Sequence, residues 1–268
     1  MSGAVDIFGE FGFRGKAGED GKDGIDTILL FFEVQTLRWL RENMQCSFVF
    51  DSKKDFELSG DKIIEIKTRA LNGENAKSEG VSTRIDFIKR KNIFCVDFTD
   101  DSSFVVKNVD LGYEEESTCL AVVTFKLSSI PEREELIFGD ANLLRGLTID
   151  EKFVHIYGVE GGALKKMYNT GEWNTIAITW KCYGDWKGGF NINDSKGDFV
   201  TSRLDEEPPE QMVWGRKFHG EITALDVYTN YDRPLPDKLC DIVYKDHYLH
   251  RSNSVCHGGV GNSDGKNF

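Results

Sequence analysis

The chain has 268 residues, of which 40% are hydrophobic and 29% charged, so it can fold into one large domain with appendages. Its formal net charge of −12 and its pI of about 5.0 disfavour nucleic acid as a partner, because an acidic surface repels phosphate backbones. No run of about 20 apolar residues occurs, so the sequence predicts no membrane span.

Glycine recurs at every third position near the N-terminus, at Gly9, Gly12, Gly15, Gly18, Gly21 and Gly24. Only glycine fits the axis where three polyproline-II chains meet, so this period is typical of a collagen triple helix. A flexible linker is the alternative, although a linker has no reason to keep its glycines in phase. The repeat lacks proline and needs either a longer collagen region or a neighbouring segment that trimerises. We assign residues 1–25 to the end of a collagen-like stalk.

An apolar segment follows at residues 26–45, which we assign to a neck. Its apolar residues fall at helical spacing and predict a short amphipathic helix over Gln35–Asn43. A helix this short needs a partner surface. It packs either on its own domain or against the necks of two other chains, and a collagen-like stalk favours the second alternative. The candidate trimer contacts are Leu30, Phe32, Val34, Leu37 and Leu40.

Residues 46–250 are dominated by short apolar and β-branched segments separated by polar turns, which is typical of a sandwich or barrel. The 19 Phe of the chain suit the interior of such a sandwich. The segment from Leu235 to Tyr248 predicts a short helix, and residues 251–268 a flexible tail. The expected strands are 47–50, 62–67, 82–89, 93–98, 103–106, 118–126, 136–139, 147–149, 153–157, 175–181, 189–192, 198–202, 211–214 and 221–228.

Three segments resemble the laminin-G and pentraxin family. Gly171–Trp180 is similar to the family's Gly-x-Trp-His strand, Gly188–Asn193 to its following hairpin, and Phe218–Tyr228 to its closing strand. The resemblance covers roughly residues 95–247. It implies an antiparallel jelly-roll β-sandwich of the concanavalin A-like class, so the expected fold is mainly β, with a collagen-like segment and a neck helix before the sandwich.

The chain departs from this family at points that matter for function. Asn174 stands where the family has His after Trp, and no pentraxin-like cluster of calcium ligands is evident. Calcium ligands therefore do not carry over residue by residue. If the domain binds Ca²⁺, the oxygen-rich loop with Asp140 and Asn142 supplies the candidate ligands, and solvated side chains are the alternative.

The loops at the rim of a sandwich are the usual place for a ligand. Trp186, with Tyr183 and Asp185 in the same Gly-rich loop, could stack on a sugar ring or could cap the core. Asn193 begins an Asn-Asp-Ser glycosylation sequon at an expected hairpin tip, where Asn-Asp is also ordinary turn chemistry.

The motifs of common hydrolases are absent from the sequence. No Glu-x-Asp-x-x-Glu strand, no Gly-x-Ser-x-Gly and no His-Glu-x-x-His occurs, so we expect a protein that is not an enzyme. His247 and His250 share one helix face and could bind a metal with Asp241 or Asp246, but a surface or trimer-facing pair is the favoured interpretation. Acid pairs such as Asp150-Glu151 and the acids at 132–135 suit solvated turns.

The six cysteines are spaced widely and form no Cys-x-x-Cys pair, which leaves disulfides or buried thiols as alternatives. No signal peptide opens the chain, so a secreted protein would have its leader removed or outside this sequence. We expect a secreted, collagen-tailed homotrimer whose heads bind glycan or protein ligands. A purely structural matrix or coat component is the alternative, and a glycan-active hydrolase is a more remote one.

Overall fold

The structure of the chain is a computed structural model that describes residues 42–50, 53–60, 62–79, 86–90, 93–98, 102–203, 209, 211–230, 240–245 and 247. These residues belong to the second of two compact units, Arg41–Phe268. The stalk and the neck contacts Leu30, Phe32, Val34, Leu37 and Leu40 lie outside the described residues, as does the tail.

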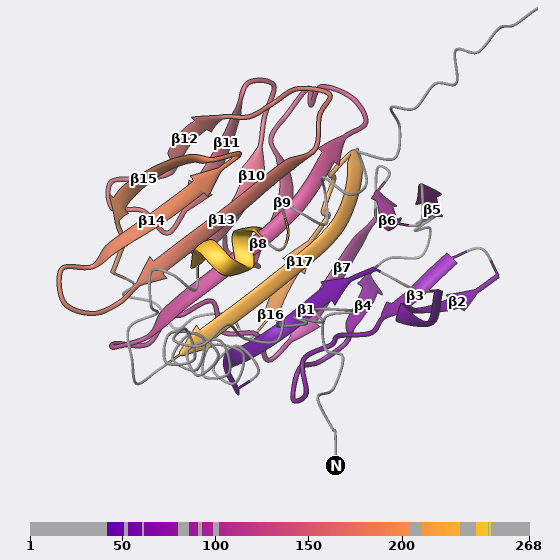
Figure 1. Cartoon of the computed structure of the whole chain (residues 1–268), viewed down its shortest axis with the longest axis horizontal. Helices are drawn as coiled ribbons and strands as arrows, with labels where there is room; N and C mark the ends of the chain where they lie inside the picture. The colour runs from indigo at the N-terminus through magenta and orange to yellow at the C-terminus, as the bar shows by residue number, and fades with distance from the viewer. Residues whose placement is uncertain are drawn as a thin grey trace, which may run out of the picture. The chain divides into compact units, whose positions relative to one another are not determined.

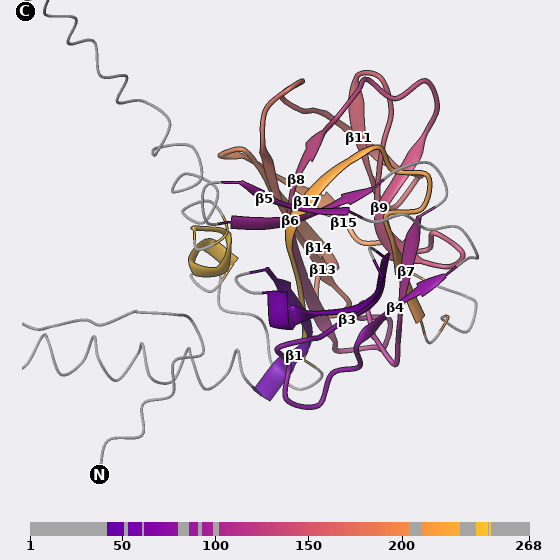
Figure 2. The same ribbon diagram turned by 90° about the vertical axis from the view of Figure 1, so that its right-hand side faces the viewer.

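The described part forms two antiparallel sheets packed face to face, which confirms the predicted jelly-roll β-sandwich (Figures 1 and 2). The first sheet follows the order β15-β14-β13-β8-β17-β6-β5, and β1 pairs with β17. Its strands are β1 Met44–Val49, β5 Asp86–Arg90, β6 Ile93–Phe98, β8 Thr118–Leu127, β13 Asn174–Lys181, β14 Lys187–Ile192, β15 Ser195–Val200 and β17 Gly220–Asn230.

The second sheet follows the order β12-β11-β10-β9-β16-β7-β4-β3-β2. Its strands are β2 Phe56–Ser59, β3 Lys62–Ile66, β4 Ala76–Glu79, β7 Ser103–Lys107, β9 Glu135–Asp140, β10 Gly146–Ile149, β11 Phe153–Tyr157, β12 Leu164–Met167 and β16 Gln211–Trp214. A short 3₁₀ helix, Lys53–Asp55, precedes β2.

The strand predictions hold wherever apolar residues alternate, and three polar strands, β2, β4 and β12, were not expected. The turn expected at 193–197 is shorter than predicted, because β15 already begins at Ser195. Asn193 and Asp194 alone form it, with φ of 47° and 71°. Two successive positive φ values define the two-residue hairpin turn that matches the twist of its strands.

Trp214 of β16 occupies the centre of the core. Its ring centroid lies 5.2 Å from that of Phe104 on β7, 5.4 Å from Phe48 on β1 and 5.5 Å from Phe98 on β6. All four side chains are fully or almost fully buried. Aromatic pairs at such distances add about 0.5–1.5 kcal/mol each beyond the burial of their area, so this cluster fixes the two sheets against each other.

None of the five described cysteines forms a disulfide, so the disulfide framework is not found in the described part of the chain. Cys46 and Cys119 face the core from β1 and β8. Burial raises the pKa of the Cys119 thiol to about 12, and that of Cys46 well above its ordinary value. These thiols stay neutral and pack as small apolar side chains.

A short helix lies on the outer face of the first sheet, and it includes the described residues 240–245 and 247 (yellow in Figure 1). His247 Nε2 lies 2.9 Å from Asp226 Oδ2 of β17, and both side chains are almost completely buried. Tyr244 accepts a 2.8 Å hydrogen bond from the backbone N of Asp194. His247 therefore connects the helix to the sheet from a buried position, and the surface interpretation was wrong for this residue.

Lowering the pH is expected to remove the contribution of Asp226 to stability. Burial alone would raise the pKa of its carboxyl group, but the charge and hydrogen bond of His247 lower that pKa below its ordinary value of 3.8. Such a carboxylate stabilises the fold above the unfolded pKa, and the effect is lost as the pH falls through the folded pKa. The Asp226→Asn variant should be less stable at neutral pH, and this deficit should shrink below pH 3.8.

Urea unfolding at a series of pH values measures the deficit. Asp241→Asn is the matched control, because Asp241 lies on the helix that carries His247 and makes an exposed ion pair with Lys196. Exposed pairs contribute about 0–1 kcal/mol, so the control should stay close to the parent chain. A deficit for Asp226→Asn that is the same at every pH would contradict the prediction.

Candidate functional site

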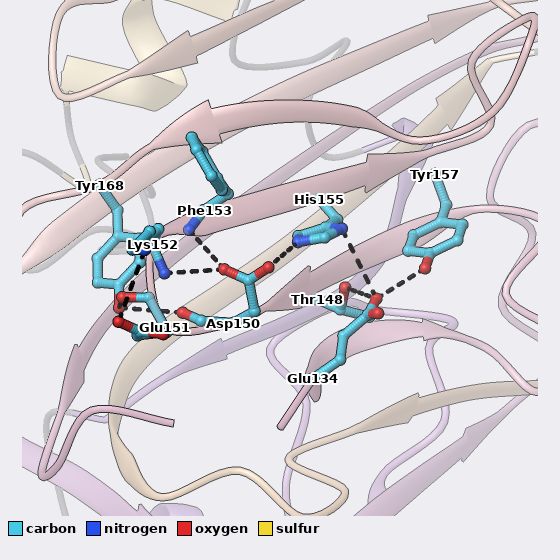
Figure 3. A network of polar contacts seen from close by, with 9 residues as sticks. All are labelled: Glu134, Thr148, Asp150, Glu151, Lys152, Phe153, His155, Tyr157 and Tyr168. Atoms are coloured by element: carbon cyan, nitrogen blue, oxygen red, sulfur yellow. Dashed lines mark hydrogen bonds and ion pairs between the residues drawn. The ribbon is translucent and has the colours of Figure 1, made fainter. Parts of the chain in front are cut away.

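A network of polar side chains lies on the outer face of the second sheet, over β10 and β11 (Figure 3). Leu147 and Ile149 of β10 point into the core, as do Val154 and Ile156 of β11. Because side chains alternate along a strand, the residues between them point outward. The outward residues of these two strands are Thr148, Phe153, His155 and Tyr157.

Asp150 anchors one side of this network from the turn between β10 and β11. Its Oδ1 accepts hydrogen bonds from the backbone N of Lys152 at 2.8 Å and of Phe153 at 2.7 Å. Its Oδ2 lies 2.7 Å from His155 Nε2. Asp is a favoured turn residue because its carboxylate can bind backbone N–H groups in this way, and here the same carboxylate also orients an imidazole.

Glu134 anchors the other side, just before β9. Its Oε1 accepts a 2.7 Å hydrogen bond from the Tyr157 hydroxyl and another from the Thr148 hydroxyl. His155 Nδ1 lies 4.0 Å from the same oxygen. The imidazole thus lies between two carboxylates, and every member of the network is held by another (Figure 3).

The pKa values in this network diverge from their ordinary range. Burial alone would raise the pKa of Asp150, but the N–H groups of Lys152 and Phe153 and the imidazole of His155 lower it to about 2. Burial likewise opposes the shift at Glu134, where the hydroxyls of Thr148 and Tyr157 and the His155 ring lower the pKa. Burial, and then the hydrogen bond to Glu134, raise the pKa of Tyr157 to about 12.

At neutral pH the network therefore presents two ionised carboxylates and a neutral phenol. A glycosidase acid needs a carboxyl group with a raised pKa, and an activated phenol would need a lowered one. The arrangement offers fixed hydrogen-bond acceptors and donors on a sheet face, which are the groups that orient a ligand in a binding site.

An apolar pair borders this polar network. Phe153 faces Met167 across the β11–β12 ladder, and Met167 is 76% exposed. Opposed side chains on one face of an antiparallel pair lie close together. The outer face of β10–β12 thus combines an ordered polar array with an exposed apolar platform, and we call it the network face.

The sequence analysis did not identify this site, since it treated the acids at 132–135 and at Asp150 as solvated. The available signal was the alternation in Phe153–Tyr157, where a histidine and a tyrosine share the outward face. The polar residues come from three separate segments and meet only through the strand register, in which Thr148 pairs with His155.

The structure brings the predicted ligand residues Tyr183, Asp185 and Trp186 together in the turn between β13 and β14. The backbone N of Trp186 donates to the Tyr183 carbonyl at 3.0 Å. The guanidinium carbon of Arg203 lies 4.8 Å from the centroid of the Trp186 ring. One face of the half-buried indole is thus covered by a cation, and its role in sugar stacking stays a prediction.

Asp140, a predicted calcium ligand, accepts four hydrogen bonds. Its Oδ1 binds the backbone N of Asn142 at 2.9 Å and of Leu144 at 3.1 Å, and its Oδ2 binds the Tyr113 hydroxyl at 2.7 Å and the backbone N of Arg145 at 2.6 Å. These contacts close the loop around Asp140. The side chain of Asn142 is exposed. No group of three or more potential metal-binding side chains occurs in the described ranges.

Asn193, the predicted glycosylation site, is held in place by its side chain. Its Nδ2 donates to Asn174 Oδ1 at 2.7 Å, and its Oδ1 accepts from the backbone N of Thr175 at 3.0 Å. Asn174, which departs from the family's histidine, is fully buried. Glycosylation at Asn193 would use the same nitrogen that makes the bond to Asn174.

No protein-family profile and no curated protein sequence matches this chain. Solved structures do match its fold. One is botulinum neurotoxin type C, whose cell entry depends on interaction with two ganglioside molecules, with a TM-score of 0.56 and 11% identity over 79% of this chain and 53% of that chain. Another is the binding domain of botulinum neurotoxin DC in complex with rat synaptotagmin II, with a TM-score of 0.54 and 13% identity over 78% and 52%.

A third is the sialidase of Trypanosoma rangeli, with a TM-score of 0.54 and 10% identity over 85% of this chain and 39% of that chain. The chain thus spans about half the length of the neurotoxin chains and less of the sialidase. The TM-scores show a shared fold, and at identities this low they show the fold alone. The resemblance to laminin-G and pentraxin domains stays a prediction. None of the described helical residues forms a segment long and apolar enough to cross a membrane.

Replacing His155 with Phe should raise the pKa of Asp150. The imidazole supplies a hydrogen bond and a charge to that carboxylate, whereas the backbone N–H groups of Lys152 and Phe153 remain in the variant. We expect the midpoint to rise from about 2 towards, but not up to, the ordinary value of 3.8. A carboxyl ¹³C NMR titration measures it. The control is His219→Phe, since His219 pairs with Glu135 and not with Asp150. A midpoint of 3.8 for Asp150 in the parent chain would contradict the hydrogen bonds described for this carboxylate.

Proposed function

We propose that the chain is the head of a secreted, collagen-tailed homotrimer that binds glycan through the network face without catalysing a reaction. The observation that carries this proposal is the mutually hydrogen-bonded set of Glu134, Tyr157 and Thr148 on the same sheet face as the half-buried Phe153 and the exposed Met167. The fold itself suits ligand binding, because a rigid sandwich can hold such a set in place.

The chemistry of the face fits a sugar. A sugar ring offers vicinal hydroxyls on its edges and C–H groups on its faces, so it needs fixed polar partners together with an apolar contact. The ionised carboxylates of Glu134 and Asp150 are acceptors for hydroxyls, and charge-assisted hydrogen bonds are about twice as strong as neutral ones. Phe153 and Met167 can contact the C–H face.

The fold neighbours support a binding role in general terms. The two neurotoxin structures concern gangliosides and synaptotagmin II, one a glycan-bearing and the other a protein partner of those proteins. The chain matches only about half of each, so their partners suggest a class of ligand but no site. The lowered pKa values of Glu134 and Asp150 favour binding over hydrolysis, because neither group holds a proton to donate at neutral pH.

A trimer would make weak individual sites effective. Linking binding modules raises the overall avidity by about 10²–10⁴ without any new contact, provided that the sites can be engaged together. The glycine repeat of residues 9–24 and the neck at 26–45 support three linked heads.

Replacing Glu134 with Gln should weaken glycan binding by about tenfold or more, because a hydrogen bond to a charged group contributes about 1.5–3 kcal/mol. Glu132→Gln is the matched control, since Glu132 is an exposed acid two positions earlier on the same segment. Glycan-array binding followed by titration of the best ligand measures both. If Trp186→Ala abolishes binding while Glu134→Gln leaves it intact, the site is the β13–β14 turn and not the network face.

Light scattering on the intact chain tests the trimer. Three chains of 30.3 kDa give about 91 kDa, which is the mass that we expect. Leu37→Asp in the neck should lower the mass towards one chain, because a charge in an apolar helix contact is costly. A single chain mass for the parent protein would show that the glycine repeat is a linker here.

A further inference from the structure

A shallow hollow of about 270 Å³ lies at the open edge of the sandwich, between β12 of the second sheet and the β14–β15 hairpin of the first. Each sheet ends here, since β12 is the last strand of one and β15 the last strand of the other. Phe190 and Ile192, both almost completely buried, form an apolar floor. The hollow adjoins the network face, because Met167 lines it and also pairs with Phe153.

Lys166 supplies the one charge among the described lining residues. It precedes Met167 on β12 and so points to the opposite side of the strand, where its Nζ lies 4.7 Å from the centroid of the Phe190 ring. No described carboxylate pairs with it. Other lysines of this acidic chain do have partners, such as Lys187 with Asp198 at 2.8 Å and Lys196 with Asp241 at 2.6 Å.

Neutral hydrogen-bonding side chains complete the rim, from Asn169, Asn193 and Ser195. The buried amide of Asn174 organises two of these positions, because its Oδ1 accepts from the backbone N of Asn169 at 2.8 Å and from Asn193 Nδ2 at 2.7 Å. The rim is therefore fixed before any ligand arrives, which lowers the cost of binding.

We propose that this hollow binds the carboxylate of an acidic sugar, as a subsite that extends the glycan face of the proposed function and rests on it. The ammonium of Lys166 donates to the carboxylate, and the amides and hydroxyl of the rim meet the ring hydroxyls. The floor of Phe190 and Ile192, with Met167, meets the C–H groups. A single ammonium matches one negative charge, whereas phosphate sites usually add arginine or several backbone N–H groups.

Calorimetric titration of the full-length chain with two matched pairs of sugars tests this subsite. The pairs are 3′-sialyllactose against lactose, and glucuronic acid against glucose. The protein is produced in a host that adds no N-glycan, because a glycan on Asn193 would occupy the hollow. We expect the parent chain to prefer the acidic member of at least one pair by about tenfold.

Two lysine variants locate the preference. Lys166→Gln should abolish the preference for the acidic sugar and leave binding of the neutral one unchanged. Lys107→Gln is the matched control, because it removes the same charge from an exposed position on β7, which β9 and β16 separate from the strands of the network face. Both variants should stay folded with melting temperatures close to that of the parent chain, since Lys107 is exposed and Gln at position 166 keeps an aliphatic stem beside Phe190.

Each of the following results would overturn the proposed subsite. Equal binding of acidic and neutral sugars in both pairs refutes it and leaves the proposed function intact. A loss of preference that is the same in both lysine variants shows an effect of overall charge and not of the hollow. If the parent chain binds no sugar, neither in these titrations nor on a glycan array, then the proposed function and the subsite fail together.

Discussion

The contact between Trp214 and the phenylalanines around it is the constraint on which the rest of this structure depends. The ring meets Phe48, Phe98 and Phe104 from three strands of both sheets. Gly215 follows with a φ of +75°, and a side chain there would collide with the Phe98 ring. The close approach of the two sheets at this point therefore requires glycine, and it fixes which residue of each strand faces inward.

Once the inward residues are fixed, the outward ones follow by alternation, and the network face is a consequence of this register. Val154 and Ile156 are buried, so His155 must lie outside, opposite Thr148. A slip of one residue in β11 would turn the imidazole towards the core and the two aliphatic side chains towards the outer face, which the core does not permit. Packing of the core thus places the His155 ring on the outer side of the sheet, and the carboxylates of Asp150 and Glu134 orient it there.

The fold could be predicted from the sequence because apolar residues alternate along most strands, as they do in β8 and β13. Two of the three missed strands, β2 and β12, are the edges of the second sheet, where only one neighbour supplies hydrogen bonds, and the third, β4, is a short polar strand between β3 and β7. The network face could not be predicted in the same way, since Glu134 and Tyr157 are distant in sequence and meet through pairing alone. His247 was misjudged for the same reason, because its partner Asp226 lies on another element.

The two sheets differ in what their outer faces can offer a ligand. On the first sheet, Thr124, Thr175 and Asp226 are buried on the outer side, where the helix at 240–247 packs. A buried carboxylate that already pairs with His247 is not available for recognition, and disturbing it costs stability. On the second sheet, Glu134 and Met167 remain exposed around an ordered network. The proposed glycan site and its subsite therefore use the outer face of the second sheet and the edge where Lys166 reaches across to Phe190, since the polar groups there are fixed and still partly exposed.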